Sequence, residues 1–469
     1  MICARDAAAL SWIYGEDGDP VIYHGHTLTG KIKFKDVIAA VKEYSFKSSN
    51  MPVILSLENH CSIPQQQRMA EYLNTILGDL LLNPSLVDGA LPCPASLCGK
   101  VIIKGKASKA GIEVEEYDED NEEDTLSPDM SIEKPPKLRG SSQGPGLALP
   151  PAESVGSAVV SPPASPGSSI GGSIRQAKLP KPKHKICPEL SAITFLVGVK
   201  FKGMQMTCRH SVSWARSFPC FAFEALSNPV IFQTGENKTD KYLKKYPSQW
   251  ADYNKRNMSR IYPGGKRVDS SNYDPVASWN VGSQQIVALN YQTPGMSMHL
   301  NDGLFRDNGG CGYILKPKEL RDPSIAFNPE VGPFSQGLTL VVWILSAQQL
   351  PKPGGAHKGE IIDPYVKLKI HGIRQDTSSS SQNTQVISDN GFNPIWNQKF
   401  EFRVTFPELA LLSMTVMDKD VQVDDFVART VLPVTCIQPG LRTVALRSAS
   451  GTRHGAFEFC SLCCRFEIY

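Results

Sequence analysis

Two short apolar runs separated by a helical pattern, between residues 52 and 106, limit the folds that this chain can adopt. The runs at 52–60 and 99–106 are rich in valine, isoleucine and leucine, as in strands buried on both faces of a parallel sheet. Apolar residues at helical spacing fill 64–82 between them, with Pro64 early in the first turn. A strand–helix–strand order implies a right-handed crossover and parallel strands. We therefore predict an α/β sheet covered by helices.

An earlier run, DPVIYHGHTLT at 19–29, adds a further strand to this prediction. Its β-branched pair and following glycine favour a buried strand that ends at His24, and the spacing over 36–44 predicts a helix with Asp36 as its N-cap. The carboxyl ends of parallel strands meet at one rim, where α/β barrels place their chemistry. The alternative for His24 is a strand-end histidine that makes structural hydrogen bonds only. The strand ends predicted to meet at the rim carry His24, Glu58, Lys104 and Lys106.

Composition excludes several classes of protein. The chain has 469 residues, of which 41% are hydrophobic and 20% charged, which is ordinary for a globular protein of two or three domains. A formal net charge of +3 is too small to indicate bulk nucleic-acid binding. No apolar run approaches the ~20 residues that span a bilayer, and the first residues do not resemble a signal peptide. The 12 cysteines lack framework spacing, which fits reduced thiols in the cytosol. Any membrane contact is therefore expected to be peripheral.

Composition also divides the α/β pattern in two. An acidic run at 113–124 and a Ser-, Pro- and Gly-rich stretch at 141–172 predict a disordered segment over 108–185. The plain interpretation is a linker, and the functional alternative is an acidic plug that covers a basic rim. Strand and helix patterns resume over 186–320, which we predict to continue the α/β domain that 1–107 begins.

A different pattern occupies the last part of the chain. Short runs of β-branched and aromatic residues, separated by turn residues, predict a separate all-β sandwich over 335–469. Carboxylates fall in three of its loop regions, and Ca²⁺ prefers several oxygen ligands. If these loops share one end of the sandwich they form a Ca²⁺ site, and the alternative is a set of ordinary acidic loops. The candidate ligands are Asp363, Asp389, Asp418 and Asp420, with Asp424 or Asp425 as a further carboxylate.

The residues expected at the rim suggest a chemistry. Lys104 and Lys106 are two positions apart, so in a strand they face the same side and could meet one phosphate group. Arg260 and Tyr262 repeat this spacing and combine a guanidinium for phosphate with a ring that can lie against a sugar. With a histidine as general acid or base, and a carboxylate that steers a proton or holds Ca²⁺, the set suits a polyanionic, ring-shaped substrate. The alternative is a ring of solvated charges at the mouth of a barrel.

Several long motifs resemble one known family. GEDGDPVIYHGHTLT, PVILSLENHC, VIIKGK, SRIYP, VDSSNYDP, QIVALNYQTPG and DNGGCGYILKP are similar to the X and Y halves of eukaryotic phosphoinositide-specific phospholipase C. GEIIDPYV, DNGFNPIW and DKDVQVDDF resemble the C2 domain of that family, in its delta and eta subtypes. The resemblance implies an incomplete TIM-like α/β barrel, split by a disordered X/Y linker and followed by an all-β C2 sandwich.

The resemblance also implies an activity and the residues that carry it. The family hydrolyses phosphatidylinositol 4,5-bisphosphate to diacylglycerol and inositol trisphosphate in intracellular signalling, with Ca²⁺ as cofactor. It implies a cytoplasmic protein, peripheral at the plasma membrane, whose partners are a phosphoinositide-containing surface and signalling activators. His24 matches a histidine that stabilises the transition state, and Glu58 matches a Ca²⁺ ligand that can also be the base. Lys104, Lys106, Arg260 and Tyr262 match substrate-binding residues, and Asp363, Asp389, Asp418 and Asp420 match C2 Ca²⁺ ligands.

The sequence departs from the family pattern at several places. The family's first histidine lies upstream of anything present here, which indicates a sequence truncated at its front. Two further Ca²⁺ ligands would fall at Ala9 and Ser11, in a stretch that does not resemble the expected strand, and a phosphate-binding serine would fall near Gln233. These departures predict that the chain as written hydrolyses phosphoinositides weakly. The alternatives are a catalytically inactive, Ca²⁺-dependent membrane-binding or scaffold protein, and an inositol-phosphate sink without turnover.

Overall fold

The computed structural model describes most of the chain outside the predicted linker. The stretch that carries His24 and nearly all of the predicted linker lie outside the described residues, as do 202–228. The described residues are 2–4, 7–14, 18–22, 30–87, 92–107, 185–201, 229–283, 286–333, 337–353, 360–377 and 381–469.

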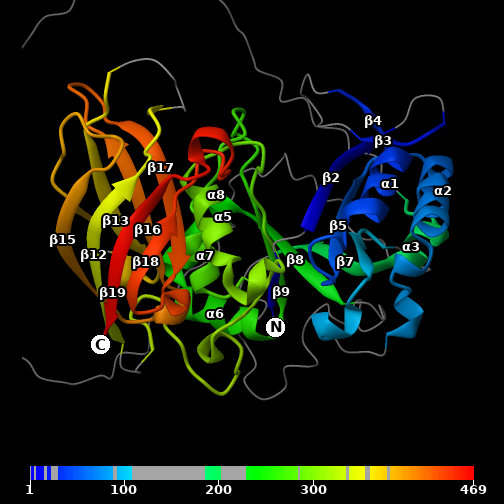
Figure 1. The fold of residues 1–469 in the computed structure, drawn as a ribbon. Coiled ribbons are helices and arrows are strands. Elements are labelled where there is room, and N and C mark those ends of the chain that lie inside the picture. The colour runs from blue at the N-terminus through cyan, green and yellow to red at the C-terminus, as the bar shows by residue number, and fades with distance from the viewer. Residues whose placement is uncertain are drawn as a thin grey trace, which may run out of the picture. The chain divides into compact units, whose positions relative to one another are not determined.

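In this part of the chain the α/β region is built on a nine-stranded sheet with the order β10-β9-β8-β7-β6-β5-β2-β3-β4 (Figure 1). All strands from β10 to β2 in this order are parallel to their neighbours, as predicted for the strands around residues 54 and 102. Among the described residues β10 and β4 each have a partner on one side only, so the sheet is an incomplete barrel. The parallel strands are β2 (Ala7–Tyr14), β5 (Val53–Asn59), β6 (Val101–Gly105), β7 (Thr194–Lys200), β8 (Val230–Gly235), β9 (Met258–Tyr262) and β10 (Ile286–Val287).

The prediction of a buried parallel strand ending at His24 is wrong. Residues Val21–Ile22 form a two-residue, half-buried strand, β3, that runs antiparallel to β2 and to β4 (Ile32–Lys33). The chain reverses between β2 and β3 in a turn in which Gly18 has a φ of 82°, a conformation that glycine adopts without steric cost. The position beside β5 is taken by β2, so residues 7–14 form the strand that their sequence did not indicate.

Helices cover the outer face of β5 and β6. They are α1 (Phe34–Tyr44), α2 (Ile63–Tyr72) and α3 (Pro188–Ile193), and their apolar side chains share one buried cluster with Leu55 and Ile103 (Figure 1). A capping box between Ser62 and Gln65 begins α2, which explains its start just before Pro64. Helix α1 begins earlier than predicted, with Lys33 as N-cap and Asp36 in the first turn. The outward-facing residues of these strands are therefore fixed by packing against helices.

Two consecutive helices, α5 (Glu236–Lys245) and α6 (Pro247–Arg256), follow β8. Tyr246, between them, has a φ of −142° and a ψ of 51°. The residue before a proline avoids the helical conformation because the proline ring clashes with it, so Pro247 ends the first helix and begins the second.

The side chains that alternate with the helix-covered ones in each strand form the inner face of the sheet. Near the amino ends this face is apolar, with Ile54, Ile102, Ile231 and Met258 in one buried cluster. Because side chains alternate along a strand, positions two and four residues further on lie on the same face. Polar side chains at the carboxyl ends of β5, β6, β8 and β9 therefore point inward, toward one another.

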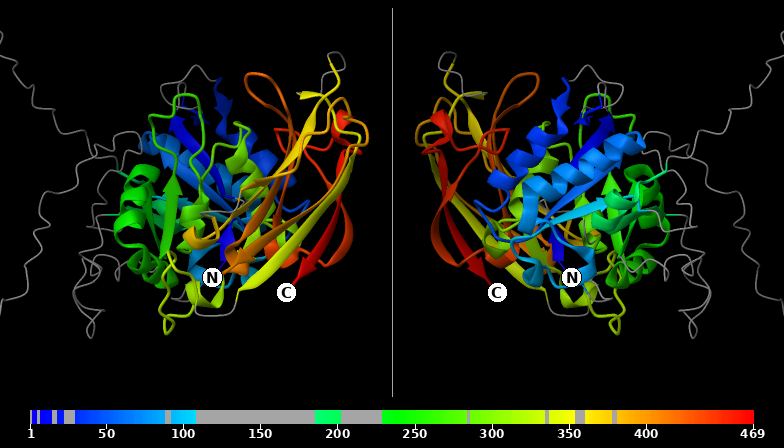
Figure 2. Two further views of the ribbon diagram at one scale, coloured as in Figure 1. Left: turned by 90° about the vertical axis from the view of Figure 1, so that its left-hand side faces the viewer. Right: turned by 90° about the vertical axis from the view of Figure 1, so that its right-hand side faces the viewer.

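The described residues of the last part form the predicted sandwich, with two four-stranded antiparallel sheets ordered β15-β12-β19-β18 and β14-β13-β16-β17 (Figure 2). A single large apolar cluster fills the space between them. The strands are β12 (Leu338–Gln348), β13 (Pro364–His371), β14 (Gln382–Asn383), β15 (Ile395–Val404), β16 (Leu411–Asp418), β17 (Asp425–Pro433), β18 (Gly440–Ala445) and β19 (Ser461–Ile468).

Helix α8 (Met296–Leu304) joins the α/β region to the sandwich by packing on β17 (Figure 1). A Cβ on Gly303 would overlap the Val431 side chain, so only glycine permits this approach. Arg306, just after the helix, donates to the Val431 carbonyl at 3.0 Å. Among the described residues, none of the helices has both the length and the apolar character needed to cross a membrane.

Candidate anion-binding active site

Lys104 occupies the inner face of β6, close to its carboxyl end, and is only 3% exposed. Its Nζ donates to Ser56 Oγ at 2.9 Å and to Gln233 Oε1 at 2.7 Å. Ser56 is its register partner on β5, whereas Gln233 lies on β8, beyond the intervening strand β7. The ammonium group therefore extends across the inside of the curled sheet.

Arg260 reaches the same point from β9. It is 4% exposed, and one guanidinium nitrogen donates to Gln233 Oε1 at 3.4 Å. Gln233 and Arg260 are register partners on neighbouring strands. Two cationic side chains, from strands that are not adjacent, thus converge on one carboxamide oxygen at the carboxyl ends of the strands.

A glycine on β7 makes this convergence possible. A Cβ built on Gly198 would lie 2.6 Å from Gln233 Nε2 and 3.7 Å from Lys104 Nζ. A contact below 3 Å is closer than side chains tolerate, so any larger residue here would displace the Gln233 carboxamide. Because Gly198 has no side chain, Lys104 on β6 can donate across β7 to Gln233 on β8.

Tyr262 stands two positions after Arg260 on β9, on the same inner face of the sheet, and is 4% exposed. The Arg260 guanidinium lies 5.2 Å from the centre of the Tyr262 ring, within the range of a cation–π contact. Burial raises the pKa of Tyr262 well above its usual value, and the negative charge of Glu58 raises it further. The phenol therefore stays protonated at neutral pH and presents an aromatic ring.

Glu58 is the last but one residue of β5, lies on the same inner face and is partly buried. Its Oε1 lies 3.5 Å from His60 Nε2. Glu58 stands two positions after Ser56 on β5, and Ser56 Oγ accepts from Lys104, so the carboxylate lies on the same face as the cations. A site with a carboxylate, two cations and an aromatic wall can hold an anionic ring and exchange a proton with it.

The structure brings together four of the predicted rim residues, namely Glu58, Lys104, Arg260 and Tyr262. Lys106, just beyond the end of β6, is half-buried. His24 lies outside the described residues. Sequence reasoning did not identify Ser56 as a contact or Gly198 as a necessary gap, although Ser56 stands two positions before Glu58 and so shares its face.

Among the described residues, the side chains near Glu58 do not supply the six to eight oxygen ligands that a Ca²⁺ ion takes. Strand β2 lies beside β5 with Ala9 in register with Ser56, and the next residues of β2 are Leu10 and Ser11, so this strand brings no carboxylate. In the parts of the chain that the structure describes, no three His, Cys, Asp or Glu side chains are grouped so as to hold a metal ion.

The acidic residues of the sandwich nevertheless lie close together. The backbone N–H of Asp363 donates to Asp418 Oδ1, and that of Asp389 donates to Asp363 Oδ1, each at 2.7 Å. Burial raises the pKa of Asp418, the hydrogen bond from Asp363 opposes this, and the charges of Asp420, Asp363 and Glu360 raise it further. These loops share one end of the sandwich, where negative charges repel one another.

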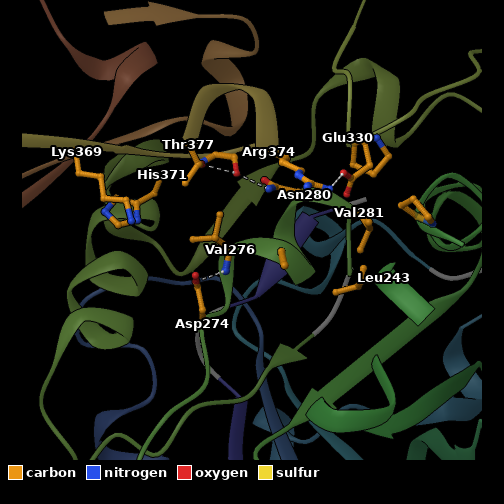
Figure 3. Close-up of a pocket in the computed structure, with 14 residues that line it drawn as sticks. Leu243, Asp274, Val276, Asn280, Val281, Glu330, Lys369, His371, Arg374 and Thr377 are labelled. Carbon is orange, nitrogen blue, oxygen red and sulfur yellow. Dashed lines mark hydrogen bonds and ion pairs between the residues drawn. The ribbon is translucent and has the colours of Figure 1, made fainter. Parts of the chain in front are cut away.

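A separate cavity of about 390 Å³ lies between α7 (Val276–Asn280) and β13 (Figure 3). Asn280 Nδ2 donates to the Gly372 carbonyl at 2.7 Å across this boundary, and Arg374 pairs with Glu330 at 3.0 Å. None of the rim residues lines it. The anion-binding rim and this cavity are therefore distinct features.

Together, the fold and site define a class of protein: a split α/β barrel with a cationic, aromatic mouth, followed by an antiparallel β-sandwich. Family comparisons agree with this class. The phosphatidylinositol-specific phospholipase C X domain matches residues 9–107, the Y domain of the same family matches 200–319, and the C2 domain matches 338–447. The chain belongs to the phosphatidylinositol-specific phospholipase C family and carries a C2 domain.

Curated relatives include 1-phosphatidylinositol 4,5-bisphosphate phosphodiesterase delta-4 of Bos taurus, 39% identical over 96% of this chain and 56% of the relative. The delta-1 protein of Rattus norvegicus is 40% identical over 94% of this chain and 52% of the relative. Inactive phospholipase C-like protein 2 of Mus musculus is 35% identical over 93% of this chain and 35% of the relative. The crystal structure of L. pealei PLC21 matches with a TM-score of 0.71 and 27% identity, covering 99% of this chain and 51% of that one. The chain thus spans about half the length of the delta relatives.

Proposed function

We propose that this chain supplies the barrel and C2 region of a phosphoinositide-specific phospholipase C, which hydrolyses phosphatidylinositol 4,5-bisphosphate to diacylglycerol and inositol trisphosphate. The observation that carries the proposal is the convergence of Lys104 and Arg260 on one oxygen, with Tyr262 and Glu58 beside them. Cations pair with phosphate through strong charge-assisted hydrogen bonds. The protein would act from the cytoplasm, at the plasma membrane and under the control of signalling activators.

Each residue of the rim has a proposed role. Lys104, Lys106 and Arg260 bind the phosphates of the inositol ring, and the Tyr262 ring packs on the sugar face. Glu58 takes the proton of the ring hydroxyl that attacks phosphorus, because a carboxylate on the inner face can reach a substrate held by the cations. We propose His24 as the group that stabilises charge on the phosphorus oxygens in the transition state.

Ca²⁺ is the cofactor that the family implies, and it offsets charge on a phosphoryl oxygen when bound. Glu58 is the ligand proposed for it in the barrel, but the sequence of β2 has Ala9 and Ser11 where the family pattern expects carboxylates. We therefore expect this chain to bind Ca²⁺ weakly in the barrel. In the C2 domain, Asp363, Asp389, Asp418 and Asp420 remain proposed ligands, since a divalent cation would relieve the repulsion around Asp418.

The same observation favours a second candidate, a protein that binds phosphoinositides and membranes without hydrolysing them. Lys104 and Arg260 need no metal ion to bind phosphate, whereas turnover does in this family. The similarity to the mouse protein named an inactive phospholipase C-like protein fits this alternative. Such a protein would act as a Ca²⁺-dependent membrane-binding scaffold or as a sink for inositol phosphates.

Hydrolysis by the purified 469-residue chain separates the two candidates. We expect little release of inositol trisphosphate from vesicles that contain phosphatidylinositol 4,5-bisphosphate, with or without Ca²⁺, together with clear binding of free inositol trisphosphate. Fast Ca²⁺-dependent release would show that Ala9 and Ser11 do not impair the site. Absence of both release and binding would contradict any phosphoinositide role for the rim.

The C2 domain is expected to bring the chain to anionic membranes when Ca²⁺ is present. Phe392, Val421 and Val423 are 70%, 103% and 78% exposed, close in sequence to the acidic loop residues, and can enter the interface once the charge is neutralised. Asp418→Asn should lower Ca²⁺-dependent co-sedimentation with phosphatidylserine vesicles that lack phosphoinositides by about tenfold, which corresponds to about 1.4 kcal/mol.

The matched control is Asp79→Asn, which removes an exposed carboxylate from the α/β region and should leave co-sedimentation unchanged. If the native chain binds these vesicles equally with Ca²⁺ and with a chelator, the four aspartates are not the ligands that control membrane binding.

A further inference from the structure

The Gln233 carboxamide is the shared partner of two buried cations. Its Oε1 accepts from Lys104 Nζ at 2.7 Å and from Arg260 at 3.4 Å, while Gln233 itself is 7% exposed. Since both neighbours can only donate, the carboxamide oxygen and not its nitrogen must face them. The nitrogen end packs against the backbone of β7 at Gly198, where no side chain intervenes.

This arrangement places a neutral acceptor between two positive charges. An amide oxygen satisfies hydrogen bonds without cancelling either charge, so the region stays attractive to an anion. The position of Gln233 Oε1 is also the position at which one phosphate oxygen could accept hydrogen bonds from both Lys104 and Arg260. A ligand oxygen and Gln233 Oε1 cannot occupy that point together.

We propose that Gln233 is an internal competitor for the phosphate monoester subsite, and so sets the affinity of the site for sugar phosphates. A phosphate that bridges Lys104 and Arg260 must first displace the Gln233 carboxamide. This inference rests on the proposed function, because it concerns the same cations, but it assigns Gln233 a role opposed to binding. Gln233 touches the binding groups and, in this role, limits the affinity of the site.

Two substitutions change the competitor in opposite directions. Gln233→Ser shortens the side chain so that it no longer reaches between the two cations, which removes the acceptor that competes with the ligand for both of them. Gln233→Glu keeps the shape but adds a negative charge that pairs with both cations and is harder for phosphate to displace. If Gln233 instead helped to bind the ligand, Gln233→Ser would bind the ligand more weakly than the native chain does.

The experiment is calorimetric titration of the full 469-residue chain with inositol trisphosphate. We expect Gln233→Ser to bind about tenfold more tightly than the native chain, which corresponds to about 1.4 kcal/mol, and Gln233→Glu to bind at least tenfold more weakly. The control is Gln67→Ser, the same chemical change at an exposed position of α2, which should not alter binding. Circular dichroism melts of each variant report whether it folds, and the nearly isosteric Gln233→Glu tests the idea if the serine variant does not.

The possible failures are distinguishable. If Gln233→Ser binds equally or more weakly while Lys104→Met abolishes binding, the competitor role is overturned and the phosphate-binding role of the rim stands. If Gln233→Glu binds as tightly as the native chain, the competitor role is also overturned. If neither the native chain nor Gln233→Ser binds inositol trisphosphate, the proposed function itself falls, and the inference falls with it.

Discussion

Lys104→Met is expected to weaken the binding of inositol trisphosphate by at least about 100-fold, or about 2.7 kcal/mol. Methionine has nearly the volume of lysine and is apolar, so it can fill the same buried path from β6 toward β8. What it removes is the ammonium group that would make charge-assisted hydrogen bonds to a phosphate in a site largely closed to water, where such bonds are strongest. Titration calorimetry on the full chain measures this loss directly.

Lys100→Met provides the matched control for this prediction. Lys100 lies just before β6, at the amino end of the strand, and donates to the Asp79 carbonyl at 2.6 Å, away from the rim. Its substitution should leave the affinity unchanged, and Lys106→Met should have a smaller effect than Lys104→Met because Lys106 is only half-buried. Equal losses in the Lys100 and Lys104 variants would mean that general charge attraction, and not a rim site, explains binding.

Several features of the site could be predicted from the sequence because they depend on the period of one strand. Lys104 follows the apolar run that forms β6, and Arg260 stands two positions before Tyr262 in β9. The alternation of side chains places Lys104 and Arg260 on the same face as the buried residues two positions earlier. Parallel strands then bring their carboxyl ends to one edge. The face on which each of these side chains lies therefore follows from the sequence of its own strand.

The rest depends on how strands are placed relative to one another. The contact between Lys104 and Gln233 crosses β7 and needs a glycine at one position of it, which no local pattern encodes. The two-residue strand β3 is too short for its period to show whether it runs parallel or antiparallel. The small and mixed residues of β2 gave no strand pattern, yet the backbone hydrogen bonds of the β5 edge are satisfied by them. Long-range pairing, rather than propensity, decides these elements.

Acid is expected to destabilise the fold between about pH 6.5 and pH 4 because two histidines are buried in neutral form. His299, on α8, is 4% exposed, and burial lowers its pKa to about 4, helped by the charges of Arg429, Arg306 and Arg447. His371, on β13 beside the cavity in Figure 3, is 6% exposed, and burial with the charges of Lys369 and Arg429 also lowers its pKa to about 4. Both side chains face arginines from the sandwich, so a proton on either would add a like charge.

The sign of the effect follows from where each state binds protons. Above the ordinary histidine pKa of about 6.5 neither state is protonated, and the full stability is present. As the pH falls below this value the unfolded chain binds protons that the folded chain refuses, so the free energy of unfolding decreases until the folded histidines titrate near pH 4. The loss at pH 5 is on the order of 2 kcal/mol for each histidine.

Urea unfolding of the full chain at pH 7.5 and pH 5 measures this difference, and the His299→Gln variant assigns its share. Glutamine does not titrate, so the pH-dependent loss should shrink by about 2 kcal/mol in the variant, whatever the substitution costs at pH 7.5. His454→Gln removes an exposed histidine and should leave the difference unchanged. An undiminished loss in His299→Gln would contradict a share of His299 at the contact between α8 and β17. It would place the acid sensitivity at His371 or in carboxylates such as Glu236, whose pKa is lowered by its hydrogen bonds with Arg267 and Gly264 despite its burial.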